Sequence, residues 1–179
     1  AVNAALDPLD RAYQATAERI NIDQSVNGRL IVEGLGGDDG FFLDDDPTLL
    51  TVDGGEGDDV FQVGQVFGSA RDTVDGIEAV EDRFQTIHTT VGWLSPGITI
   101  PAVLYGGEGN DQFRIYANKA DLRLEGENGN DDFLVRAFLL ADTGGIQLLA
   151  GAGDDSIRYN VNAPVSIDGG AGFDTVTVL

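Results

Sequence analysis

The chain has 179 residues, enough for one well-buried domain, and 42% of them are apolar, which excludes a simple acidic disordered tail. Its formal charge of −21 comes from 31 acidic and 10 basic residues, and so acidic a surface excludes nucleic acid and anionic membrane as partners. Asp outnumbers Glu by 23 to 8, a bias typical of turns and metal sites rather than of helix surfaces. The chain has no Cys and no apolar run near 20 residues, so we expect neither disulfides nor a membrane-spanning segment.

Residues 1–27 lack the pattern that follows them. Residues 18–22 alternate between polar and apolar side chains and predict a strand of an entry coil. The pair Asp7-Pro8 is equally able to open a short capping helix. The segment is therefore expected to be an entry coil or a cap.

Beyond this segment an eight-residue motif recurs six times, at residues 34–41, 54–61, 106–113, 126–133, 150–157 and 169–176. In every copy the fourth residue is Gly, the sixth is Asp and the eighth is large and apolar. The sixth positions are Asp39, Asp59, Asp111, Asp131, Asp155 and Asp174. They follow one another at intervals of 20, 52, 20, 24 and 19 residues, so the repeating unit is about twenty residues long, with one insertion.

The flanks of each motif alternate between apolar and polar residues, as in Leu122, Arg123 and Leu124. This period of two indicates short strands with one buried face. A single unit cannot bury that face, whereas stacked units can. We therefore expect one all-β parallel solenoid over residues 1–179, with coils at 28–63 and 102–179. A meander of antiparallel hairpins is the alternative, but hairpins do not need the same six-residue turn at every second corner.

Residues 64–101 form the insertion. Ile77, Val80, Phe84 and Ile87 fall near helical spacing, whereas residues 86–91 are β-branched and resemble a strand. We expect one degenerate coil and a loop here.

The repeated turn has the chemistry of a calcium site. Calcium takes six to eight oxygen ligands in loose geometry, and glycines with positive φ turn their carbonyl groups toward one point. The sixth-position Asp adds a charged oxygen, and two stacked turns would enclose an ion that binds only when the coils fold. Six sixth-position carboxylates are the primary candidate ligands. The secondary candidates are the fifth-position residues Asp38, Asp58, Asn110, Asn130 and Asp154, which serve the turn, the ion or both, and the carbonyls of Gly37, Gly55, Gly57, Gly107, Gly109, Gly129, Gly151, Gly153, Gly170 and Gly172.

A second acidic run, Asp44-Asp45-Asp46, falls on the opposite turn of its coil. It lacks the central Gly and the later Glu of an EF-hand loop. We expect a solvated turn there.

Residues 54–62 read Gly-Gly-Glu-Gly-Asp-Asp-Val-Phe-Gln, which resembles the RTX (haemolysin-type) calcium-binding nonapeptide, Gly-Gly-x-Gly-x-Asp-x-apolar-x. The resemblance covers residues 34–63 and 102–179. It implies a right-handed parallel β-roll with calcium between adjacent coils, in a large protein that bacteria secrete or display on their surface. Members of that family typically carry two nonapeptides per coil, and this chain carries one, so ions are expected along one edge only. Leu35, Glu127 and Ala150 replace glycines, and Phe173 occupies the last fifth position; weaker binding is expected in those copies.

Other functions have weaker support. A phosphate-binding loop needs a helix after its glycines, and here strands follow. Charged residues of the insertion (Glu78, Glu81, Asp82 and Arg83) have no diagnostic catalytic spacing, and the single His88 lies among Thr residues. We therefore expect no enzyme activity and assign no catalytic residue. Trp93 near Phe84 would suit either a sugar-stacking platform or an anchoring role in the core.

Two functional hypotheses follow. The first is a structural module that folds and becomes rigid on extracellular calcium, with neighbouring repeats of the same long polypeptide as partners. The second is a module that binds or modifies an extracellular polysaccharide through the insertion.

Overall fold

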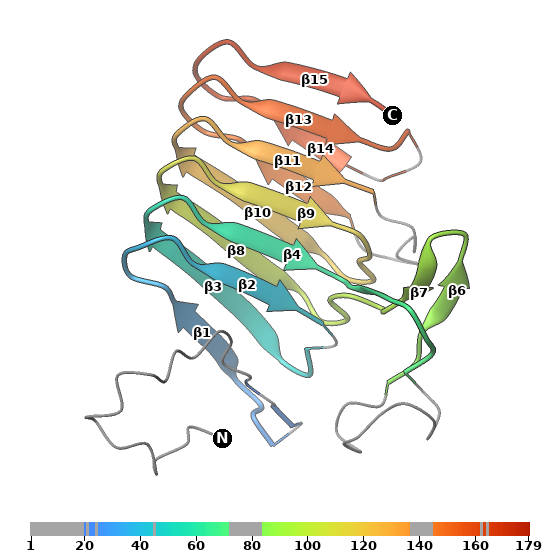
Figure 1. Cartoon of the computed structure of the whole chain (residues 1–179). Helices are drawn as coiled ribbons and strands as arrows, with labels where there is room; N and C mark the ends of the chain where they lie inside the picture. Colours follow the sequence, from blue (N-terminus) through green and yellow to red (C-terminus); the bar gives the residue numbers. More distant parts are fainter. Residues whose placement is uncertain are drawn as a thin grey trace, which may run out of the picture.

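The structure, a computed structural model, describes residues 20, 22–23, 25–44, 46–71, 84–136, 145–161, 163 and 165–179. These residues form an all-β solenoid without a helix, in which parallel strands stack in two layers (Figure 1). No helix that could cross a membrane is found in this part of the chain. The predicted fold class is confirmed: the stack has about six turns, and equivalent positions recur about every twenty residues.

Each layer is a six-stranded parallel sheet. The first sheet contains, in order, β1 (Arg29–Glu33), β3 (Leu49–Glu56), β8 (Ala102–Glu108), β10 (Leu122–Asn128), β12 (Ile146–Leu149) and β14 (Val165–Asp168). The second contains β2 (Gly40–Leu43), β4 (Val60–Val63), β9 (Gln112–Ile115), β11 (Asp132–Val135), β13 (Ser156–Tyr159) and β15 (Thr175–Val178). Neighbouring strands pair so that equivalent positions of successive coils lie side by side. Leu124, for example, lies between Leu104 and Leu148. The repeat in the sequence is thus the repeat of the coil.

The core lies between the two sheets and consists of the alternating apolar residues. Phe61, Phe113 and Phe133 are completely buried, and each comes from the eighth position of its motif. Their rings stack at centroid distances of 4.7 Å, and Phe41 continues the column at 5.0 Å from Phe61. Because strands in a sheet are about 4.8 Å apart, parallel stacking puts identical side chains at their contact distance. This column fixes the coil-to-coil translation that also sets the spacing of the turns.

The insertion does not add a coil to the stack, and the expected degenerate coil is not found in its described part. Strand β3 pairs directly with β8, and β4 pairs directly with β9, across the whole insertion. Instead β5 (Val66–Phe67), β7 (Gly92–Leu94) and β6 (Ile87–Thr89) form a small antiparallel sheet beside the solenoid (Figure 1). The β-branched residues at 86–91 predicted the strand β6, but not that its partner would be local. The helical spacing of Ile77 and Val80 lies outside the described residues, as do the predictions for residues 7–8 and most of 18–22.

Candidate metal-binding edge

All six motif turns lie on one edge of the solenoid, where the chain passes from the first sheet to the second (Figure 1). We call this the Gly-Asp edge, formed by residues 34–39, 54–59, 106–111, 126–131, 150–155 and 169–174. The other connections between the sheets form the return edge, whose described residues are 44, 46–48, 64–71, 84–101, 116–121, 136, 145, 160–161 and 163. All predicted sixth-position ligands therefore lie in one line, one per coil.

The sixth-position Asp residues form a ladder, which we call the inner ladder. From the second turn onward, each Oδ1 accepts a hydrogen bond from the backbone N–H of the sixth residue in the preceding turn. The donor–acceptor distances are 2.7 Å for Asp39 to Asp59, 2.8 Å for the three following steps and 3.1 Å for Asp155 to Asp174. One carboxylate oxygen of each of these five acceptors thus has a structural partner, which explains part of the need for a short acceptor at this position.

The fifth-position residues form a second ladder with the opposite direction, the outer ladder. Here each side-chain Oδ1 accepts from the backbone N–H of the following turn, as Asp58 accepts from Asn110 at 2.8 Å. The other steps measure 2.7 to 3.0 Å and run from Asp38 through Asn130 and Asp154 to the N–H of Phe173. Asn and Asp are equally good acceptors at this position, because each hydrogen bond uses only the side-chain Oδ1. The fifth position therefore has a turn-forming role in the structure, and Phe173 offers no side-chain oxygen for continuing it.

The second oxygen of the inner-ladder carboxylates has no such partner. Oδ2 of Asp59, Asp111, Asp131 and Asp155 is buried without a hydrogen bond, and these residues are at most 2% exposed. Asp39 and Asp174, in the first and last turns, are half-buried. A buried carboxylate oxygen without a partner is costly, so four in a line indicate that a cation or a proton is needed to complete the site.

In the copies that begin with Gly, these oxygens lie against the Cα atoms of the first motif residues, so closely that only Gly fits there. A methyl group added to Gly106 would lie 2.2 Å from Oδ2 of Asp111 and 2.7 Å from the carbonyl oxygen of Gly126 in the next coil. The corresponding distances at Gly126 are 2.1 Å to Asp131 Oδ2 and 2.2 Å to the carbonyl oxygen of Ala150. A carboxylate oxygen and a carbonyl oxygen from adjacent coils therefore lie side by side against the first residue, and we call this pair of oxygens the first-residue cradle. This donor set is the hard-oxygen chemistry that suits calcium.

The electrostatics of the inner ladder disfavour its ionised carboxylates. Burial, with neighbouring carboxylates as a lesser cause, raises the pKa of Asp111 to about 6 and that of Asp131 to about 7, although the N–H hydrogen bonds act in the other direction. The pKa of Asp59 is raised by the same causes, and that of Asp155 is raised by burial and by the neighbouring carboxyl group of Asp174. Near neutral pH the ionised ladder is thus a row of disfavoured negative charges, and a bound cation would relieve them.

The ten glycines proposed as carbonyl ligands all have positive φ, as expected for turns of this kind. Their carbonyl groups follow the edge from coil to coil; those of Gly57 and Gly109, for example, approach the Cα atoms of Gly109 and Gly129. The carbonyl groups that meet the buried carboxylates belong to the first motif residues, Gly106 and Gly126 among them, which sequence reasoning had not selected. Among the described residues, no three His, Cys, Asp or Glu side chains group together as a metal site. An ion on this edge would therefore be held mainly by carbonyl oxygens, with carboxylates supplying the charge.

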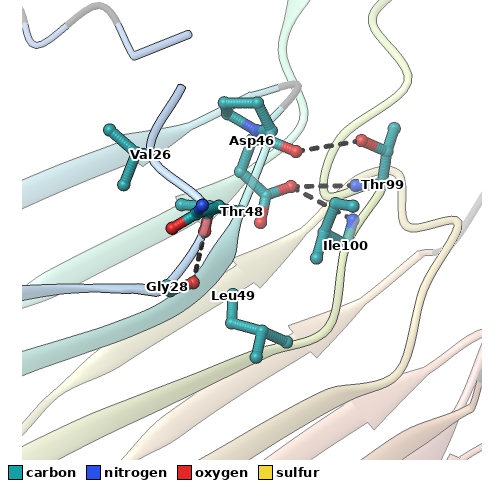
Figure 2. A pocket seen from close by; sticks show the side chains of 9 residues that line it. Val26, Gly28, Asp46, Thr48, Leu49, Thr99 and Ile100 are labelled. Carbon is teal, nitrogen blue, oxygen red and sulfur yellow. Dashed lines mark hydrogen bonds between the residues drawn. The ribbon is translucent and has the colours of Figure 1, made fainter. Parts of the chain in front are cut away.

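The prediction for Asp44 and Asp46 is wrong: they do not form a solvated turn. Asp46 is buried, and its Oδ1 accepts from the backbone N–H groups of Thr99 at 3.0 Å and Ile100 at 3.4 Å (Figure 2). Asp44 Oδ1 accepts from the N–H of Gly97 at 3.2 Å. These carboxylates hold the end of the insertion against the solenoid beside a shallow pocket lined by Val26–Gly28, Asp46–Leu49, Thr99 and Ile100. The sequence carried no signal for this contact because its partners are more than fifty residues away.

The remaining candidates are distributed over the insertion. His88 stacks on Trp93 across β6 and β7, with ring centroids 4.8 Å apart, and Phe84 packs edge-on against Phe67 at 5.6 Å. The ring that packs on Trp93 is thus His88. Glu78, Glu81, Asp82 and Arg83 lie outside the described residues.

Comparison of the chain with models of protein families, with curated proteins and with solved structures found no match.

Proposed function

We propose that this chain is a calcium-binding structural repeat module of a protein that is secreted or displayed on a bacterial surface. The observation that carries the proposal is the row of buried Oδ2 atoms without partners, of which those of Asp59, Asp111 and Asp131 lie beside a carbonyl oxygen of the next coil in a first-residue cradle. The resemblance of the turns to the RTX nonapeptide supports the same conclusion. The role is mechanical and not enzymatic: the module gives a rigid, elongated shape to the polypeptide, whose neighbouring repeats are its partners.

Calcium would act by completing each pair of turns. The first-residue cradle combines oxygens of two coils, so the ligands come together only in the folded stack, and binding adds to the folding free energy. Extracellular modules bind calcium with dissociation constants of about 10⁻⁴–10⁻³ M. At a tenfold excess over the dissociation constant, each ion contributes about 1.4 kcal/mol. Several ions along one edge are then comparable to the whole stability of a domain this size, of about 5–15 kcal/mol.

The test is circular dichroism during calcium titration of the fully chelated chain, with magnesium as the control ion. We expect a cooperative gain of β signal and of melting temperature at sub-millimolar to millimolar calcium. Magnesium is expected to have little effect, because it demands a compact octahedral set of ligands and gives up its water reluctantly. The same β signal and melting temperature in excess chelator and in calcium would contradict the proposal.

One observation favours a second role, binding of an extracellular polysaccharide by the insertion. Phe67, Trp93 and His88 occupy facing positions across the three strands of the small sheet, so their side chains share one face. Aromatic side chains on a sheet face suit the apolar faces of sugar rings. Trp93→Ala is expected to abolish retention of the chain in glycan-containing native gels while leaving the solenoid's circular dichroism unchanged. Equal migration of both proteins with and without glycan would rule this role out.

A further inference from the structure

The fifth turn departs from the others at its first residue. Five copies begin with Gly, at positions 34, 54, 106, 126 and 169, whereas this copy begins with Ala150. Ala150 is completely buried. Its backbone keeps the pairing of the repeat, because its N–H donates to the carbonyl of Asp168 at 2.9 Å. Only the methyl group is new, and it has no exposure to solvent.

The position of that methyl group follows from the glycine copies. At Gly54, Gly106 and Gly126 the space that a methyl group would take lies 2.1, 2.2 and 2.1 Å from Oδ2 of the carboxylate in the same turn. The carbonyl oxygen of the next coil lies 2.6, 2.7 and 2.2 Å from the same point. A carbon atom there must displace at least one of two oxygens that lie side by side in the glycine copies. In the fifth turn the methyl group of Ala150 takes this place, so the two oxygens cannot meet there as they do in the glycine copies, and Oδ2 of Asp155 is buried without a hydrogen bond.

The same step differs in two further respects. The inner-ladder bond from Asp155 to Asp174 is the longest of the five, at 3.1 Å against 2.7–2.8 Å elsewhere. The outer ladder ends at Phe173, which has no side-chain oxygen and is 89% exposed. Three independent features therefore distinguish the junction between the fifth and sixth turns.

We infer that Ala150 is a specificity-determining residue that closes the cation site between the fifth and sixth turns. The inference rests on the proposed function, since it concerns which cradles of the Gly-Asp edge accept an ion. It separates the four preceding junctions, which calcium stabilises, from the junction between the fifth and sixth turns, which packing and hydrogen bonds alone hold together. This junction, between β12 and β14 and between β13 and β15, would then remain able to open when the four preceding junctions are fully loaded.

The direct test is Ala150→Gly, examined by isothermal titration calorimetry with calcium and by thermal unfolding. We expect the variant to bind one more ion per chain than the natural sequence. The difference in melting temperature between the variant and the natural chain should change sign with conditions. In chelator the variant should melt a few degrees lower, because Gly loses more backbone freedom on folding, and in saturating calcium it should melt a few degrees higher, because it binds one more ion. A merely structural role of the methyl group predicts a lower melting temperature in both conditions.

Ala152→Gly is the matched control, because it makes the same change two residues later in the same turn, outside the cradle. It should lower the melting temperature in both conditions and leave the number of ions unchanged. Gly106→Ala is the reciprocal variant and should lose one ion; if it fails to fold, Ala150→Gly still decides the matter. Hydrogen exchange gives a separate readout, with amides of Thr175–Val178 protected by calcium in Ala150→Gly but not in the natural chain.

The outcomes separate the two proposals. Absence of calcium binding in the natural chain would remove the proposed function itself. Calcium binding with equal numbers of ions in the natural chain and in Ala150→Gly would leave the proposed function standing and overturn this inference alone.

Discussion

The two edges of the solenoid solve the same problem in different ways. Both must carry the chain from one sheet to the other and provide acceptors for the N–H groups of the turns. On the Gly-Asp edge one six-residue turn does this in every coil, with Asp111 and Asp131 making the same bond as their neighbours. On the return edge the hydrogen bonds differ from coil to coil. Asp46 Oδ1 accepts from the N–H of Thr99, for example, and Asp121 Oδ1 accepts from the N–H of Gly145 at 3.0 Å.

The difference shows where the fold tolerates variation. The described parts of the insertion, residues 64–71 and 84–101, lie on the return edge, and on the same edge the chain leaves β11 at Arg136 and enters β12 after Gly145. On the Gly-Asp edge a turn donates to one neighbour and accepts from the other in both ladders, so a change of length would break bonds on two sides. A constant turn length on this edge is therefore a geometrical requirement, whereas the return edge only has to connect the second sheet to the first strand of the next coil.

The largest expected effect comes from lengthening the two edges in turn. Two residues, Gly-Ser, inserted after Asn110 would break the four ladder bonds of that turn, which are worth about 1 kcal/mol each. We expect the free energy of unfolding to fall by about 4 kcal/mol or more in urea. The same insertion after the exposed Gly68, which lies in the insertion on the return edge, should cost less than about 1 kcal/mol, because added loop length is inexpensive. Similar losses at both places would contradict the contrast between the edges.

Carboxylate substitutions should separate the edges by their calcium dependence. Asp131→Ala leaves the buried N–H of Asp111 without an acceptor and should cost about 1–3 kcal/mol in chelator. Asp131→Asn keeps an acceptor and removes a buried charge, so in chelator at pH 8 it should be at least as stable as the natural chain.

In saturating calcium Asp131→Asn should become less stable than the natural chain, because it loses a charged ligand. Asp46→Ala on the return edge is the comparison, and its cost should be equal in calcium and in chelator. Urea unfolding of the three variants in both conditions measures this. A loss of stability in Asp46→Ala that depends on calcium would contradict the assignment of calcium binding to the Gly-Asp edge alone.

Stability in chelator should fall as pH rises from about 4 to about 7. Burial raises the folded-state pKa of Asp111 to about 6 and that of Asp131 to about 7, from a usual value of 3.8. The folded chain therefore binds more protons than the unfolded chain in this range, and protonation favours folding. The favourable contribution is complete below about pH 4 and is lost as pH passes the raised pKa values.

Urea unfolding at several pH values measures this slope. The slope should be smaller in Asp131→Asn, and saturating calcium should reduce it by favouring the ionised carboxylates. Stability that rises with pH in chelator would show that the inner ladder is not the dominant titrating group.

The smallest effect concerns two turns that lack a glycine at the second position. Leu35 and Glu127 have φ of 75° and 72°, whereas Gly107 and Gly151, in the coils on either side of Glu127, take the same region without strain. Glu127→Gly should stabilise the chain by about 1 kcal/mol. Glu127→Gln keeps the strained backbone and removes only the charge, so a full gain from this variant would assign the effect to electrostatics.

The sequence by itself determined the repeat, the strands and the edge on which the Asp residues gather. Those features depend on local patterns: a period of two in the strands, a glycine turn of constant length and a coil of about twenty residues. The register of β3 with β8 across the insertion follows from the same logic, since only equivalent residues of different coils match.

The tertiary structure alone decided the rest. Three features depend on contacts between coils and therefore on the rise of one coil over the next. They are the opposite directions of the two ladders, the burial of Asp46 against Thr99 and the position of the Ala150 methyl group at its cradle. The sequence of one repeat is the same whether its Asp side chains bond to the coil before it or to the coil after it. Only the stacked chain places the two oxygens of an inner carboxylate such as Asp131 in different surroundings, one on an N–H group and the other buried without a partner against the Cα of a glycine.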